Sequence, residues 1–80
     1  MGKAIDDIEG YKFYFYSEEG NEPPHIHVKK AAGKAKFWLT PEVSLRESYG
    51  FKVQELKKAW KLVITNREQL INKYNEVLNR

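Results

Sequence analysis

Pro23-Pro24-His25-Ile26-His27-Val28 is the stretch from which the fold of this 80-residue chain can be worked out. Each proline fixes its own φ angle and moves the residue before it toward extended geometry. The residues that follow alternate, so that Ile26 and Val28 point to one side of a strand and His25 and His27 to the other. We expect the two aliphatic side chains to face a hydrophobic core and both imidazoles to face away from it.

We place the strand that contains the two histidines at residues 25–30, and further strands are predicted before and after it. Residues 11–16 are rich in aromatic side chains and residues 34–39 alternate apolar with polar side chains, as strands do. The short connection over 31–33 predicts a hairpin between the second and third strands. A polar, turn-forming loop with three acidic residues, residues 17–24, separates the first two.

The remaining residues before the helical region are harder to assign. We expect residues 1–10 to be a partly mobile lead-in, because Asp6, Asp7 and Gly10 are poor strand formers. Residues 43–46 are predicted to add a short fourth strand, with residues 47–50 as the turn that follows it. The sheet therefore has three or four antiparallel strands.

From about Lys52 the apolar residues recur every three or four positions, which predicts an amphipathic helix. The unbroken register to the C-terminus favours one long helix. The alternative is a break near Asn66, because residues 63–65 are β-branched and Asn66 with Gln69 forms a helix-start pattern. The apolar residues that form one stripe along this helix are Val53, Leu56, Trp60, Val63, Leu70, Tyr74 and Val77.

These elements predict a single α+β domain, residues 1–80, in which the helix covers one face of the sheet. A straight helix would overhang the sheet and leave its C-terminal apolar residues, from Leu70 onward, for a partner such as a second copy of the chain. If the helix is broken, its second half would turn back and this patch would face the protein interior. The predicted core face of the sheet consists of Phe13, Phe15, Ile26, Val28, Ala35, Phe37 and Leu39.

Composition limits the classes of function. The chain has no cysteine, which favours a reducing cytoplasm and excludes thiolate chemistry and cysteine-rich zinc sites. It shows neither a signal-peptide pattern nor an apolar run long enough to span a membrane, so we expect a cytoplasmic protein without membrane contact or cofactor. A net charge of +3 is a weak indication of an acidic partner.

The face of the sheet opposite the predicted core combines cations with aromatic rings and has no acidic residue. Single-stranded nucleic acids are bound by such surfaces, because bases stack on rings and lysines follow the phosphates. The alternative is a solvated outer face whose lysines prevent edge pairing. The residues predicted on this face are Lys12, Tyr14, Tyr16, His25, His27, Lys29, Lys34, Lys36 and Trp38.

The histidine pair leaves three hypotheses open. His25 and His27 are candidate ligands of one metal ion, with a third ligand from Glu18, Glu19 or Glu22. They are also candidate catalytic residues for acid–base cleavage of a phosphodiester, in which Lys29, Lys36 or Arg46 would stabilise the phosphate. In the third hypothesis both imidazoles are structural and hold the acidic loop on the sheet.

Several segments resemble a bacterial family known as domain of unknown function 4160. They are residues 22–28, residues 35–39 with Pro41, Gly50-Phe51, and the helical segments Glu55-Leu56 and Asn66-Arg67-Glu68. Members are often encoded beside another small domain, as in toxin–antitoxin pairs. The resemblance therefore implies a partner protein and an RNA-directed activity, and it assigns no residue beyond the motif positions His25 and His27. A binding module of this kind is the leading hypothesis, and a small ribonuclease-type toxin is the alternative.

Overall fold

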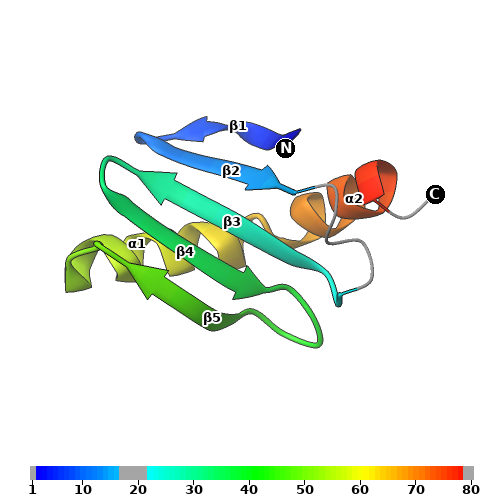
Figure 1. Cartoon of the computed structure of the whole chain (residues 1–80). Helices are drawn as coiled ribbons and strands as arrows, with labels where there is room; N and C mark the ends of the chain where they lie inside the picture. Colours follow the sequence, from blue (N-terminus) through cyan, green and yellow to red (C-terminus); the bar gives the residue numbers. More distant parts are fainter. Residues whose placement is uncertain (1, 17–21, 79–80) are drawn as a thin grey trace.

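The computed structural model describes residues 2–16 and 22–78, which form five strands and two helices. The strands make one antiparallel sheet in which each strand pairs with the next along the chain (Figure 1). The α+β class is confirmed, whereas the prediction of three or four strands is wrong by one or two. The elements are β1 Gly2–Ile8, β2 Tyr11–Phe15, β3 His25–Lys30, β4 Gly33–Trp38, β5 Ser44–Tyr49, α1 Val53–Thr65 and α2 Arg67–Leu78.

The strand β1 replaces the partly mobile lead-in that the sequence predicted. Glu9 and Gly10 join it to β2 with φ angles of 51° and 86°, the left-handed geometry of a two-residue hairpin turn. The pairing with β2 shifts register between Lys3 and Ile5 and again between Ile5 and Ile8. These irregularities explain why residues 1–10 show no regular alternation that would have revealed a strand.

The last strand is longer than expected. β5 continues to Tyr49, so the turn predicted over 47–50 is wrong, and the chain leaves the sheet at Gly50 with φ of 74°. The register against β4 shifts between Lys36 and Phe37. As a result Glu47 lies opposite Lys36 on one face, whereas Leu45 pairs with Phe37 and packs on the core.

The helical region begins where the sequence predicts, but it is broken at Asn66. The backbone N–H of Lys52 donates to the Glu55 carboxylate over 2.9 Å at the start of α1. The side-chain amide of Asn66 donates to the Leu62 carbonyl over 2.8 Å, and the backbone N–H of Asn66 donates to the same oxygen over 3.0 Å. The favoured prediction of one continuous helix is therefore wrong, and the break was correctly identified as its alternative.

The second helix is fixed to the sheet by its first residue. The Arg67 guanidinium donates from Nε to the Leu39 carbonyl over 2.7 Å and from a terminal nitrogen to the Pro41 carbonyl over 3.1 Å. α1 lies against β4, and α2 lies against β1 and β3 (Figure 1). Leu70 and Tyr74 are buried and Ile71 packs against the core, so this part of the patch expected to overhang the sheet is internal. These three residues therefore give no structural argument for a homodimer through the C-terminal helix.

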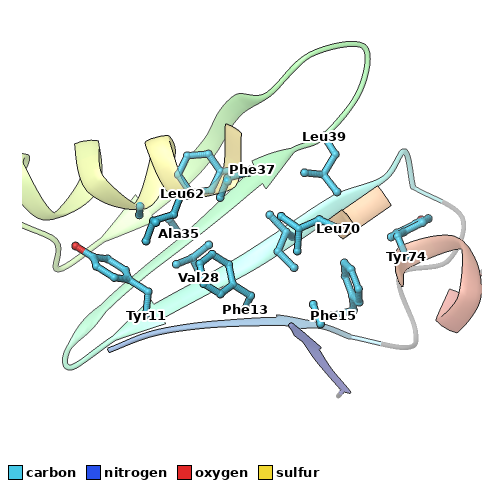
Figure 2. Close-up of a cluster of buried hydrophobic side chains, with 14 residues drawn as sticks. Tyr11, Phe13, Phe15, Val28, Ala35, Phe37, Leu39, Leu62, Leu70 and Tyr74 are labelled. Carbon is cyan, nitrogen blue, oxygen red and sulfur yellow. The ribbon is translucent and has the colours of Figure 1, made fainter. Parts of the chain in front are cut away.

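The hydrophobic core fills the space between the sheet and the two helices (Figure 2). All seven residues predicted for the core face of the sheet are buried. The helical stripe is less regular: Val53 is 71% exposed, whereas Ala59 and Leu62, which the prediction omitted, are buried. Trp60 is half-buried and packs edge-to-face on Phe37 with ring centroids 5.7 Å apart.

Neither helix of the described part of the chain has the length and apolar character that crossing a membrane requires.

Candidate nucleic-acid interface

The face of the sheet that the helices leave uncovered carries two neighbouring rows of side chains that run across the strands. Residues opposite each other in antiparallel strands place their side chains on the same face. The central row contains Lys3, Tyr14, His27, Lys36 and Glu47, one from each strand from β1 to β5. The lysine row contains Lys12, Lys29 and Lys34, and Tyr49 of β5 continues it.

The lysine row is unfavourable for the fold by itself, because like charges directly opposite each other destabilise a sheet. The Lys12 ammonium lies 3.0 Å from the Asp7 carboxylate, which relieves part of this repulsion. Among the ion pairs of the described residues, none includes Lys29 or Lys34, and both side chains are exposed. The row therefore offers positive charge to an anion from outside the fold.

Aromatic rings gather beside the lysines. The His27 ring stacks on Tyr14 with centroids 5.5 Å apart and planes at 18°, and Tyr16 meets His27 edge-on at 4.6 Å. Burial, the hydrogen bond to Tyr16 and the nearby Tyr16 hydroxyl together raise the pKa of Tyr14 to about 12. Tyr14 therefore stays neutral at physiological pH and adds no negative charge to the face.

His25 does not lie on this surface, and here the prediction is wrong. Its side chain is 0% exposed and its ring meets Tyr74 of α2 at 5.8 Å, Trp38 at 5.9 Å and His27 at 5.4 Å. Nδ1 lies 2.9 Å from the Pro23 carbonyl, and since a carbonyl only accepts, Nδ1 carries the proton. The strand alternation was correct, but the segment before β3 and the helix α2 close over this end of the sheet.

The segment that leads into β3 is tied down by two further contacts. The Tyr74 hydroxyl donates to the Glu22 carbonyl over 2.8 Å, and the Lys36 ammonium donates to the Glu22 carboxylate over 2.7 Å. His25 Nδ1 also lies 3.8 Å from that carboxylate. Glu22 therefore joins α2, β4 and the buried histidine, which is the arrangement expected of a structural imidazole.

The hypothesis of a metal site finds no support in this geometry. Among the described residues, no three His, Asp or Glu side chains are grouped as metal ligands would be. Glu22, the one proposed third ligand that is described, binds Lys36, and His25 turns Nδ1 toward the Pro23 carbonyl. The other proposed ligands, Glu18 and Glu19, lie outside the described residues, as does most of the acidic loop.

Two hollows lie on the open face. The larger has a volume of about 450 Å³ and connects the lysine row with the rings. It is lined by Lys3, Asp7, Lys12, Phe13, Tyr14, Tyr16, Lys29 and Lys34. The smaller, about 200 Å³, lies toward β5.

The predicted site residues fall into three groups. Lys12, Tyr14, Tyr16, His27, Lys29, Lys34 and Lys36 come together on the open face. Trp38 is half-buried near His25, with the Lys36 ammonium 5.1 Å from its ring centroid. Arg46 is exposed and lines neither hollow.

Sequence reasoning missed four residues of this face, Lys3, Asp7, Glu47 and Tyr49, and its expectation that the face has no acidic residue is wrong. Lys3 and Asp7 belong to β1, which was predicted as a lead-in, and Glu47 and Tyr49 belong to the part of β5 that was predicted as a turn. The one available signal was the alternation of Glu47 with Tyr49, which matches a continued strand.

Comparisons with known proteins give one match. The pattern of the family described as Domain of unknown function (DUF4160) matches residues 10–75, which include β2 to β5, α1 and most of α2. No curated protein and no solved structure matches the chain significantly. The match covers well over half of the 80 residues, and the chain therefore belongs to the DUF4160 family.

Proposed function

We propose that the protein is a cytoplasmic binding module that holds single-stranded RNA on the open face of its sheet and acts together with a partner protein. The observation that carries this proposal is the lysine row beside a cluster of stacked rings. The rings supply surfaces on which bases stack, and the lysines lie where the phosphates of the same strand would pass.

The charge of the row supports an anionic ligand, because Lys29 and Lys34 stand directly opposite each other. The rings favour RNA over an acidic protein as that ligand. A carboxylate-rich segment would use the lysines but would offer no ring that stacks on Tyr14 or His27. A base stacked on such a ring typically contributes about 1–3 kcal/mol to binding, so the rings add substantially to the affinity for RNA.

Fluorescence anisotropy with a labelled 12-nucleotide single-stranded RNA of mixed sequence tests the proposal. We expect the double variant Lys29→Gln/Lys34→Gln to weaken binding about tenfold or more, because it removes two phosphate contacts. The matched control is Lys57→Gln/Lys61→Gln, which removes the same charge from the exposed side of α1. This control is expected to bind almost as tightly as the unchanged protein.

Two outcomes would contradict RNA as the ligand. Equal losses in the two double variants would mean that only net charge matters. A labelled peptide of glutamates that binds as tightly as RNA, and that is insensitive to His27→Ala, would indicate an acidic protein instead.

The same samples, run on a denaturing gel, test the alternative of a ribonuclease-type toxin. The burial of His25 weakens this alternative, because acid–base catalysis by two histidines needs both rings at the substrate. We expect the RNA to stay intact. Cleavage that is lost in His27→Ala would instead favour an enzyme.

The partner protein is the second part of the proposal, and β5 supports it. This strand is an edge of the sheet, and an edge strand offers unpaired backbone groups to which another chain can add a strand. Tyr49 on β5 is also largely exposed. The simplest partner is a second copy of the chain, and sedimentation velocity tests whether the protein forms a dimer. If the protein is a monomer at all concentrations, the partner must be a different protein.

A further inference from the structure

The smaller hollow on the open face has the size and the lining of a site for one nucleobase. Its volume of about 200 Å³ is below the roughly 300–1,000 Å³ of pockets for drug-sized ligands. It is lined by Tyr14, Tyr16, His27, Lys34, Ala35, Lys36, Glu47 and Tyr49. Resting on the RNA-binding function proposed above, we propose that this hollow selects guanine and that Glu47 is the residue that recognises it.

Among the described residues of this face, Glu47 has an unusual carboxylate, because the other two acidic side chains are engaged. Asp7 lies 3.0 Å from the Lys12 ammonium, and Glu22 lies 2.7 Å from Lys36. Lys36 is directly opposite Glu47 in the sheet, yet its ammonium binds Glu22.

Within the described part of the chain, Glu47 has a single ion-pair neighbour, the Arg46 guanidinium at 3.7 Å. That distance is longer than the roughly 2.7–2.9 Å of a charge-assisted hydrogen bond. The side chain is 46% exposed. Both oxygens therefore remain able to accept hydrogen bonds from a ligand.

A carboxylate only accepts hydrogen bonds, and it accepts two at once when two donors lie side by side. Guanine has such a pair on its pairing edge, N1–H beside the N2 amino group. Adenine and cytosine each present one amino group beside a ring nitrogen that accepts, and uracil presents one N–H between two carbonyls. Only guanine can satisfy both oxygens of Glu47 without placing an acceptor against them.

The same carboxylate is expected to weaken the binding of the other bases. RNA is negatively charged, so a carboxylate among the lysines weakens binding unless a base donates to it. Glu47 is therefore expected to act in two directions, tightening the complex with guanine and weakening the complexes with the other bases. This pair of opposite effects distinguishes recognition from simple charge repulsion.

The experiment uses four labelled nonamers, each made of uridines with guanine, adenine, cytosine or uracil at the central position. With the unchanged protein, we expect the guanine nonamer to bind roughly tenfold more tightly than the others, as one good bidentate contact predicts. Glu47→Gln should bind all four nonamers with nearly equal affinity, because it binds the guanine nonamer more weakly and the other three more tightly than the unchanged protein does. The matched control is Glu68→Gln, an exposed acid on α2, which should keep the preference.

Equal binding of all four nonamers to the unchanged protein, or an unchanged preference in Glu47→Gln, would overturn the assignment of guanine while leaving RNA binding in place. Tighter binding of every nonamer to Glu47→Gln, guanine included, would also overturn it, because only repulsion would then have been removed. If none of the nonamers binds, the proposed RNA-binding function itself fails. Circular dichroism of each variant establishes that the fold is kept.

Discussion

Gly50 is the residue at which the chain turns from the sheet to the helices. Its φ angle is +74°, a region that residues with a side chain rarely adopt. A Cβ atom there would lie 2.6 Å from the Ala32 carbonyl oxygen in the turn between β3 and β4. Two independent constraints, the backbone angle and the close approach of another backbone segment, therefore require glycine at this position.

We expect Gly50→Ala to lower the free energy of unfolding by about 2–4 kcal/mol, more than the roughly 1–2 kcal/mol that a left-handed residue costs by itself. Urea denaturation measures the difference. Gly10→Ala is the control, because Gly10 also has a positive φ of 86° but a Cβ there would meet only the flexible Lys30 side chain, at 3.4 Å. Equal losses in the two variants would show that the contact with Ala32 has no energetic consequence.

We expect substitution of His25 to affect mainly the stability of the fold and substitution of His27 to affect mainly RNA binding. His25→Ala removes a buried ring and should cost roughly 2–4 kcal/mol of stability, close to the range for truncating a large buried side chain. His27→Ala truncates a half-buried ring and should cost less than about 1.5 kcal/mol. It should nevertheless weaken RNA binding about fivefold or more, through the loss of a stacking surface.

Thermal melts measure the stability of both alanine variants, and fluorescence anisotropy on the same preparations measures their RNA binding. If His25→Ala does not fold, His25→Phe keeps a ring and removes the hydrogen bond to the Pro23 carbonyl, for which we expect a loss of about 1 kcal/mol. Equal stability of the two alanine variants would contradict a structural role that is specific to His25.

At the scale of the elements, the two helices cover the sheet because the chain changes direction at Asn66. α1 packs on β4, and α2 turns toward β1 and the start of β3. The side chain of Asn66 ends α1 and that of Arg67 attaches α2 to the segment after β4. Arg67 therefore holds the second helix in place.

We expect Arg67→Met to lower stability by roughly 1.5–3 kcal/mol, because two charge-assisted hydrogen bonds to the Leu39 and Pro41 carbonyls are lost. Arg67→Lys should recover only part of this, since an ammonium lacks the guanidinium fork that reaches both acceptors. Urea denaturation gives both values, and Glu68→Ala, at an exposed neighbouring position, should change stability by less than about 0.5 kcal/mol. A loss for Arg67→Met as small as that of Glu68→Ala would show that this anchor is not needed.

At the scale of the whole molecule, the sheet separates two environments. One face is sealed by both helices, and the other presents lysines and rings to solvent. The described residues contain no buried side-chain nitrogen or oxygen without a hydrogen-bond partner, so their interior polar groups are satisfied within the fold. Binding there is expected to depend mainly on charge and stacking, with little rearrangement of the backbone.

We expect RNA binding to weaken steeply with salt. Each phosphate that a lysine neutralises on a single strand contributes about −0.7 to the slope of log K against log salt concentration, so the three lysines of the row predict a slope near −2. Anisotropy titrations between 50 and 300 mM salt, roughly the range in which such slopes are measured, give this value. Lys29→Gln/Lys34→Gln should leave a slope of about −0.7, and an unchanged slope would exclude these lysines from the phosphate contacts.

The sequence by itself determined the sheet side of the core and most of the open face. The alternation of Ile26 and Val28 with the histidines, together with Phe13, Phe15, Ala35, Phe37 and Leu39, placed every residue predicted for the core face of the sheet correctly, because burial of apolar side chains fixes strand register. The α+β class and the start of α1 followed from the change of period near Lys52.

Only the tertiary structure decided three further features. The irregular pairing of β1 and β5 shifts residues such as Leu45 from one face to the other, so alternation did not reveal β1 or the second half of β5. The break at Asn66 depends on contacts with Leu39 and Pro41, which are distant in the sequence. His25 is buried because α2 and the segment around Glu22 close over the end of the sheet, and local alternation has no information about segments that pack from elsewhere in the chain.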